Sequence, residues 1–173
     1  MKCPMRFVLP WLHGLWVLVA GLMLGVQLAT FLFAPSFFHA AQQGLLTSQL
    51  AGTLAGKCFE SANLFTLIAL PLLLLVLSAG GKRGANRTIV GLLAVALVLQ
   101  LIESVGIAPA IAGLREEIAR EVGAVANLPE DDPRRGRFGM LHGLSVLRGG
   151  VQWLVGAAAL LVYTRSLSGN TNP

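Results

Sequence analysis

Four long apolar runs constrain the fold of this chain more than any other feature. They occupy residues 10–34, 59–79, 88–107 and 140–163, and each is rich in Leu, Val, Ala and Ile. As an α-helix, a run of about 20 apolar residues crosses the hydrocarbon core of a bilayer, which is about 30 Å thick. The sequence therefore predicts an all-α integral membrane protein, a bundle of four transmembrane helices in a single membrane domain.

The composition agrees with a fold in lipid. Of the 173 residues, 55% are hydrophobic and 12% are charged, whereas soluble domains carry roughly 25% charged residues. The mean hydropathy is +0.72. A water-soluble fold could not cover so much apolar surface, so the solvent for this chain is predicted to be the membrane.

The first run could be mistaken for a signal peptide. It follows Lys2 and Arg6, and Phe-His-Ala at residues 38–40 faintly resembles a cleavage site. However, the apolar part of a signal peptide is about 7–15 residues long, and this run is longer. We therefore interpret it as a retained transmembrane anchor.

The segments between the runs predict one interfacial helix, one tight turn and one outer loop. Residues 36–57 repeat apolar side chains every three to four positions, which predicts a helix that lies in the membrane interface and continues into the second span. The glycines and bases of residues 80–84 predict a tight turn. The outer loop, residues 114–137, is predicted to hold a short solvated helix over 114–126, whose charges form a wet face, and a Pro-containing return over 127–137.

Basic residues beside the spans predict the orientation of the chain. Lys2 and Arg6 precede the first span, and further bases lie in residues 82–87, so both termini are predicted to be cytoplasmic. The arginines of residues 114–137 fall on the opposite side, and the two sides carry equal numbers of bases. The short loops and the first helix receive the greater weight.

Three residues that carry a full charge lie within the apolar runs: Glu60, Glu103 and Arg148. Such a residue costs roughly 2.5–3.5 kcal/mol on insertion scales, so it normally has a partner and faces the interior of the bundle. At about 1.5 Å of rise per residue, Glu103 and Arg148 fall at a similar depth in the outer half of the bundle. We predict that they form an ion pair and that Glu60 lies near His142.

Other polar residues share helix faces with these charges, because side chains three and four positions apart lie on one face. The sequence therefore predicts a polar pocket in the outer half of the bundle. The alternative is that these residues only join helices by hydrogen bonds, worth roughly 0.6 kcal/mol each. The predicted pocket consists of Gln27, Glu60, Asn63, Glu103, His142, Ser145, Arg148 and Gln152.

Small residues predict close contacts between helices. Gly21 and Gly25 in the first span, and Ser145 and Gly149 in the fourth, have the spacing that lets helices approach closely. We predict that Gly21, Gly25 and Gly149 pack within the chain, with a contact between two copies as the alternative. Pro71 removes a backbone hydrogen bond and should bend the second span.

No sequence pattern indicates catalysis or a cofactor. There is no Ser-His-Asp pattern, glycine-rich phosphate loop or HExxH, and Cys3 and Cys58 lack metal-ligand spacing. His13 and His142 are predicted at opposite ends of the bundle, so they cannot share one haem iron, whereas a surface metal site at His39 and His142 is the alternative. We predict no enzyme, no metal site and no cofactor. The net charge of +5 is scattered over the span ends, which favours lipid head groups over nucleic acid.

Two stretches of the chain resemble a known family. Residues 21–38 read Gly-Leu-Met-Leu-Gly-Val-Gln-Leu-Ala-Thr-Phe-Leu-Phe-Ala-Pro-Ser-Phe-Phe, and residues 137–145 read Arg-Phe-Gly-Met-Leu-His-Gly-Leu-Ser. Together they resemble the bacterial four-helix domain-of-unknown-function family whose eukaryotic relatives are called transmembrane protein 205-like. Its most specific string, Phe-x-x-Leu-His-x-x-Ser, begins at Phe138, and Gly149 stands where an Asn often follows. The resemblance implies the four-helix layout and singles out His142, but it supplies no reaction.

These observations leave three hypotheses for the function. The leading one is a non-enzymatic structural or accessory protein of the bacterial inner membrane, with membrane lipids as partners and a homo-oligomer or other membrane proteins as further candidates. The second is a small transporter or permeability factor that uses the polar pocket. The third is a haem- or copper-associated redox protein.

Overall fold

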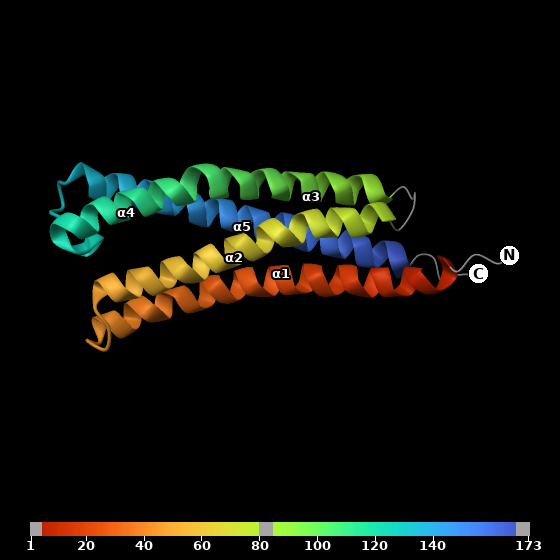
Figure 1. Ribbon diagram of the computed structural model, residues 1–173, viewed down its shortest axis with the longest axis horizontal. Coiled ribbons are helices and arrows are strands. Elements are labelled where there is room, and N and C mark those ends of the chain that lie inside the picture. Colours follow the sequence, from red (N-terminus) through yellow and green to blue (C-terminus); the bar gives the residue numbers. More distant parts are fainter. Residues whose placement is uncertain (1–4, 80–84, 169–173) are drawn as a thin grey trace.

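The computed structural model describes residues 5–79 and 85–168, and these residues form a bundle of antiparallel helices (Figure 1). The start of α1 and the end of α5 lie at one end of the bundle, which we call the inner end. The outer end holds the α1–α2 and α4–α5 connections. The elements are α1 (Met5–Gln42), α2 (Ser48–Ala79), α3 (Ala85–Leu101), the π-helix η1 (Ile102–Ile107), α4 (Ala108–Val122), the 3₁₀ turn η2 (Val125–Asn127) and α5 (Pro133–Ser168).

Four helical stretches are long and apolar enough to cross a membrane: Trp11–Gln42, Ser48–Ser78, Arg87–Val122 and Pro133–Leu167. Every predicted span lies within one of the long helices, and α3, η1 and α4 follow one another as a single rod. The prediction of an all-helical chain with four membrane-crossing helices is confirmed. Lys2, Cys3 and the predicted turn at residues 80–84 lie outside the described residues.

The segment predicted as an interfacial helix is divided between two long helices. α1 continues to Gln42, and Gly44 adopts a φ of 74°, a backbone conformation that glycine adopts readily. The backbone N–H of Leu45 donates to the Ala40 carbonyl, which is a common way to close a helix end. Thr47 then accepts a hydrogen bond from the Leu50 N–H and caps α2. The repeat of apolar residues was read correctly as helical, but Gly44 breaks it into a hairpin.

The outer connection between α4 and α5 is shorter than predicted. α4 ends at Val122, so the predicted helix after the third span is present. α5 begins at Pro133, inside the segment predicted as a return loop. Proline suits the first turn of a helix because its missing N–H would have no partner there. The Asp132 carboxylate accepts the Arg134 backbone N–H at 2.8 Å and caps this turn.

The inner half of the bundle holds the main apolar core, to which α1, α2, α3 and α5 all contribute. The Trp16 ring stacks on Tyr163 with centroids 3.9 Å apart, and its N–H donates to the Leu73 carbonyl at 3.2 Å. Toward the outer end, the α1–α2 hairpin and the α4–α5 pair diverge (Figure 1). The helices are therefore packed around apolar side chains in the inner half and separated in the outer half, where the polar residues lie.

Candidate functional site

The structure places the two predicted intramembrane charges together. Nε of Arg148, on α5, lies 3.2 Å from Oε2 of Glu103, on η1, and the two side chains are 11% and 3% exposed. Neither of these two atoms has a hydrogen-bond partner of good geometry. The result is a buried ion pair whose hydrogen-bonding capacity is only partly used.

The position of Glu103 depends on the π-helix η1. The backbone N–H of Ala108 donates to the Glu103 carbonyl, which is the five-residue spacing of a π-helix. Pro109 follows directly, and a proline lacks an N–H and crowds the preceding turn of a regular helix. The wider turn accommodates that crowding. The predicted span over residues 88–107 assumed a regular helix here, although Gly106 and Pro109 are sequence signals of a local change in the helix.

Two glutamines and a serine on α3 and α5 form hydrogen bonds with the ion pair. Ser145 donates to the other carboxylate oxygen of Glu103 at 2.7 Å. Arg148 donates to the side-chain oxygens of both Gln100 and Gln152. Gln152 also donates to Gln100 at 3.0 Å, and both glutamines are fully buried. Gln100 is therefore central to the network, although the predicted pocket did not include it.

One hydrogen bond extends this network toward the α1–α2 hairpin. The Gln100 amide nitrogen donates to the Asn63 backbone carbonyl at 3.2 Å. Within the hairpin, Gln27 donates to Thr66 at 3.0 Å, while the Gln27 side-chain oxygen is buried without a partner. Most polar contacts of the pocket residues thus lie either between α1 and α2 or between α5 and the rod of α3 and η1. The Gln100–Asn63 hydrogen bond joins these two helix pairs.

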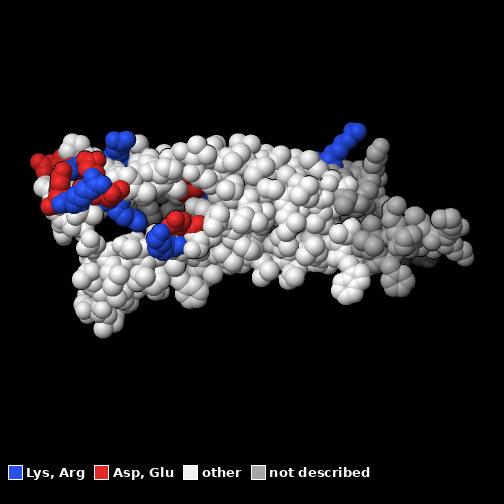
Figure 2. Space-filling view, viewed as in Figure 1, with Lys and Arg blue, Asp and Glu red and all other residues white. Residues whose placement is uncertain are grey.

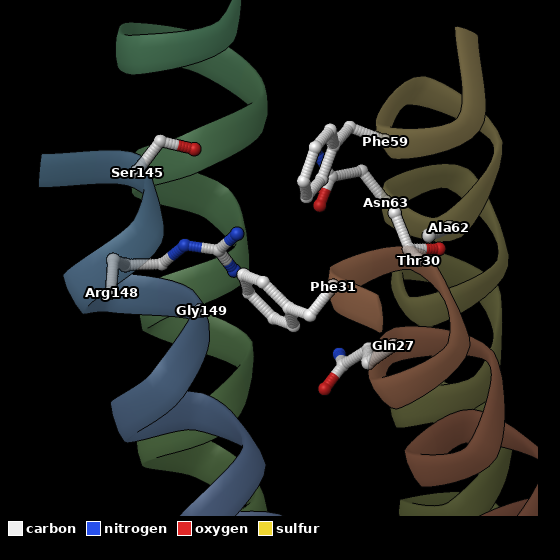
Figure 3. Close-up of a pocket in the computed structure, with 9 residues that line it drawn as sticks. All are labelled: Gln27, Thr30, Phe31, Phe59, Ala62, Asn63, Ser145, Arg148 and Gly149. Atoms are coloured by element: carbon white, nitrogen blue, oxygen red, sulfur yellow. The ribbon is translucent and has the colours of Figure 1, made fainter. Parts of the chain in front are cut away.

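A small cavity separates the two helix pairs (Figure 3). Arg148 and Ser145 face it from α5, and Gln27 and Asn63 face it from α1 and α2. Its volume is ≈ 20 Å³, which is room for about one water molecule. Gln27, which lines this space, also carries a buried side-chain oxygen without a partner among the described residues.

The predicted glycine contacts divide into two groups. A Cβ on Gly149 would lie 2.6 Å from Cζ of Phe31, so α1 and α5 approach closely at this glycine. Gly156 is similar, with a Leu24 methyl 3.0 Å from the Cβ position. Gly21 and Gly25, contrary to the prediction, are exposed and have open space around them, because this face of α1 points away from the other helices.

Glu60 and His142 are not placed beside the other pocket residues. Glu60 pairs with Lys57 at 2.6 Å, and the two side chains are 67% and 71% exposed. His142 is also exposed, and its ring lies parallel to Phe138 with centroids 6.1 Å apart. The two helix pairs diverge at this level, so a shared helix face does not bring these residues together.

Arg115 has a structural role that the sequence analysis missed. It was predicted to lie on a solvent-exposed helix face. Instead, its guanidinium extends from α4 to α2 and donates to the Gly52 carbonyl at 3.1 Å. It also lies against Gly56, where a Cβ would collide with it, and 5.7 Å from the centroid of the Phe138 ring. The spacing of Gly52 and Gly56, four residues apart, was the available signal.

Most of the visible charge of the described residues gathers at the outer end of α4 and α5, and a hollow separates it from the α1–α2 hairpin (Figure 2). Arg134 pairs there with Glu121 at 2.5 Å and with Asp132 at 2.8 Å. Hydrogen bonds from Arg134 lower the pKa of the Asp132 carboxyl, so this group keeps its charge into more acidic solution. Arg115 joins α4 to α2 on the inner side of these charged residues.

The histidines lie apart from one another. His13, near the start of α1, shares a hydrogen bond of 2.5 Å with the Tyr163 hydroxyl near the end of α5, whereas His142 lies near the opposite end of α5. His39 contacts Gln43 in the outer connection. In the described parts of the chain, no three His, Cys, Asp or Glu side chains gather in a way that could hold a metal ion.

Comparisons with known proteins identify a family but no activity. No match was found among curated proteins or among solved structures. A family model described as a domain of unknown function, DUF4149, matches residues 18–120. This region runs from α1 into α4 and includes Gln27, Asn63 and Glu103, but not α5. Because the match covers more than half of the sequence, the chain belongs to the DUF4149 domain-of-unknown-function family.

Proposed function

We propose that the protein is a non-enzymatic membrane transporter or permeability factor that handles a proton or another small ion at the Glu103–Arg148 pair. The observation that carries the proposal is the burial of this pair beside a cavity in the interior of a membrane bundle. Ionisable residues in such positions typically mark ion pathways or proton relays.

Energetic magnitudes favour a functional role over simple helix adhesion. Interhelical hydrogen bonds in a membrane contribute roughly 0.6 kcal/mol each, whereas each intramembrane charge costs roughly 2.5–3.5 kcal/mol. Gln100 and Gln152 already join α3 to α5 without any charge. Adding Glu103 and Arg148 to this contact is therefore an expensive way to hold two helices together, and ion handling gives a reason for it.

The size of the cavity limits what passes in the described conformation. A volume of ≈ 20 Å³ holds about one water molecule, so protons fit this space better than hydrated solutes. A larger ion requires the α1–α2 hairpin to move away from α5. Phe31 and Phe59, whose rings meet edge to face at 5.7 Å, line the cavity and are the side chains that would have to move.

Neutralising Glu103 is the direct test. In liposomes with a pH gradient and an internal pH dye, we expect the unmodified protein to speed proton equilibration and Glu103→Gln to reduce this flux to the level of empty liposomes. Glu60→Gln is the matched control, because Glu60 is an exposed carboxylate on the same side of the bundle. Equal fluxes for empty liposomes, the unmodified protein and both variants would contradict proton transport.

A structural or accessory role is the second candidate, and the nearly closed polar network favours it. The cavity is small, and the pocket residues mostly bond one another rather than face open space. Such a protein would act through other membrane proteins, through a second copy or through lipids. It would show no flux in the liposome experiment, and Glu103→Gln would affect its stability alone.

For the location, we propose the inner membrane of a bacterium with both chain termini in the cytoplasm, on the basis of the flanking bases. A cysteine reporter tests the orientation. In a Cys3→Ser, Cys58→Ser background, we expect Gln43→Cys to react with a membrane-impermeant thiol reagent in intact cells and Arg87→Cys to react only after lysis. Both positions are exposed and lie at opposite ends of the bundle. The reverse pattern would place the termini outside.

We also propose kinship with the transmembrane protein 205-like proteins. Its most specific support, the string from Phe138 to Ser145, lies outside the region that the family model matches. The structure gives this string local roles: Phe138 contacts Arg115 and His142, and Ser145 donates to Glu103. A relative in which these contacts recur would support the kinship.

A further inference from the structure

A surface groove runs along the α1–α2 hairpin on the other side of the wall that borders the polar cavity. Thr30 and Ala62, both buried, line the groove as well as the cavity. Phe33 and Phe65 are exposed and form its sides. The groove is shallow and open to its surroundings, and its volume is ≈ 570 Å³. It is lined almost entirely by apolar atoms.

The groove follows the helix axes. On α2, Lys57, Ser61 and Phe65 line it at intervals of four residues, so they occupy one helix face. At 1.5 Å per residue, this face extends for about 12 Å. The Gln27–Thr66 hydrogen bond fixes the level of α1 against α2, which places Val26 at the inner end of the groove and Phe33 nearer to Lys57. An apolar channel along a transmembrane helix has the direction of a lipid acyl chain.

Lys57 gives the outer end of the groove a polar group. An ammonium has three donors, and within the described part of the chain Lys57 donates one side-chain hydrogen bond, to Glu60. The lysine side chain is 71% exposed, so its remaining donors are accessible. Lys57 lies just before the apolar run at residues 59–79. If that run fills the hydrocarbon core, which is about 30 Å thick, the ammonium lies near the head groups at its outer edge.

We propose that this groove binds one glycerophospholipid, with an acyl chain against Thr30 and Ala62 and the phosphate on Lys57. A second copy of the chain fits the groove less well. A helix with its side chains is about 10 Å across, and it would have to cover the exposed Lys57–Glu60 pair. A phosphate needs only the free donors of Lys57. This inference goes beyond the proposed function and is independent of Glu103.

Native mass spectrometry of the full chain in mild detergent, titrated with palmitoyl-oleoyl phosphatidylglycerol, tests the proposal. Ser61→Trp fills the groove and is expected to weaken binding of the first lipid by about tenfold, since several methylene contacts are lost. Leu64→Trp is the matched control, because Leu64 is 59% exposed on the same helix and does not line the groove. It is expected to leave binding unchanged.

Two substitutions that change lipid binding in opposite directions test the head-group contact. Lys57→Gln should weaken binding by about fivefold, because one basic side chain near an anionic head group is lost. Glu60→Gln should bind at least as tightly as the unmodified protein, because it removes a competitor for Lys57. Equal effects of Ser61→Trp and Leu64→Trp would overturn the groove as the site. Loss of a dimer in Ser61→Trp, with lipid binding intact, would assign the groove to a second copy instead.

Discussion

Replacing Arg148 with leucine is expected to lower the free energy of unfolding by about 3–5 kcal/mol. The substitution leaves Glu103, whose side chain is 3% exposed, as a buried carboxylate without its cation. It also removes the donors that Arg148 provides to Gln100 and Gln152. Unfolding of the purified protein in mixed detergent micelles, followed by circular dichroism, measures the change.

The matched double variant separates charge from packing. Adding Glu103→Gln to Arg148→Leu removes the unpaired charge, so the double variant should be more stable than Arg148→Leu alone. This recovery is expected because deleting both members of a buried ion pair is often close to neutral. If the double variant were as unstable as the sum of the two single variants, the arginine would be acting mainly through its packing and its bonds to the glutamines.

Replacing Gly149 with leucine is expected to destabilise the protein by about 1–3 kcal/mol, the usual cost of overfilling a packed contact. Even a Cβ at this position would lie 2.6 Å from the Phe31 ring, and that ring is held edge to face against Phe59. The same unfolding measurement applies.

Gly150→Leu provides the control, because Gly150 is the next residue on α5 and has nothing within 4 Å of its Cβ position. Leucine also favours helix more than glycine does, so this variant should be as stable as the unmodified protein or more stable. Combining Gly149→Leu with Phe31→Ala should recover part of the loss. Equal instability of the Gly149 and Gly150 variants would show that α1 and α5 do not meet at Gly149.

The general fold and the ion pair were predictable because they depend only on the length of the apolar runs and on the rise of a helix per residue. The apolar runs are long enough to specify helices by themselves, and the helix rise places Glu103 and Arg148 at one depth. Neither inference needs a crossing angle or a side-chain conformation. Whether the polar pocket has a function stays a prediction.

Features that depend on how helices diverge were not predictable in the same way. Glu60 and His142 occupy suitable faces, but the helix pairs separate at their level, so they have different partners. Gly21 on α1 and Gly149 on α5 are both glycines on faces with small residues four positions apart. The sequence does not say which of these two faces packs against a neighbouring helix. Arg115 looked solvated because its partner is a backbone carbonyl, which no side-chain pattern reveals.

The position of the ion pair within the chain affects the order in which the protein enters the membrane. Glu103 belongs to the third span and Arg148 to the fourth, so during synthesis the carboxylate reaches the bilayer before its partner exists. Apolar residues at a helix centre each favour insertion by about 0.3–0.6 kcal/mol, so roughly six of them offset one acidic residue. The Leu- and Val-rich stretch of α3 supplies them. A chain truncated before α5 would keep this acid in the third span without the cation that pairs with it in the full protein.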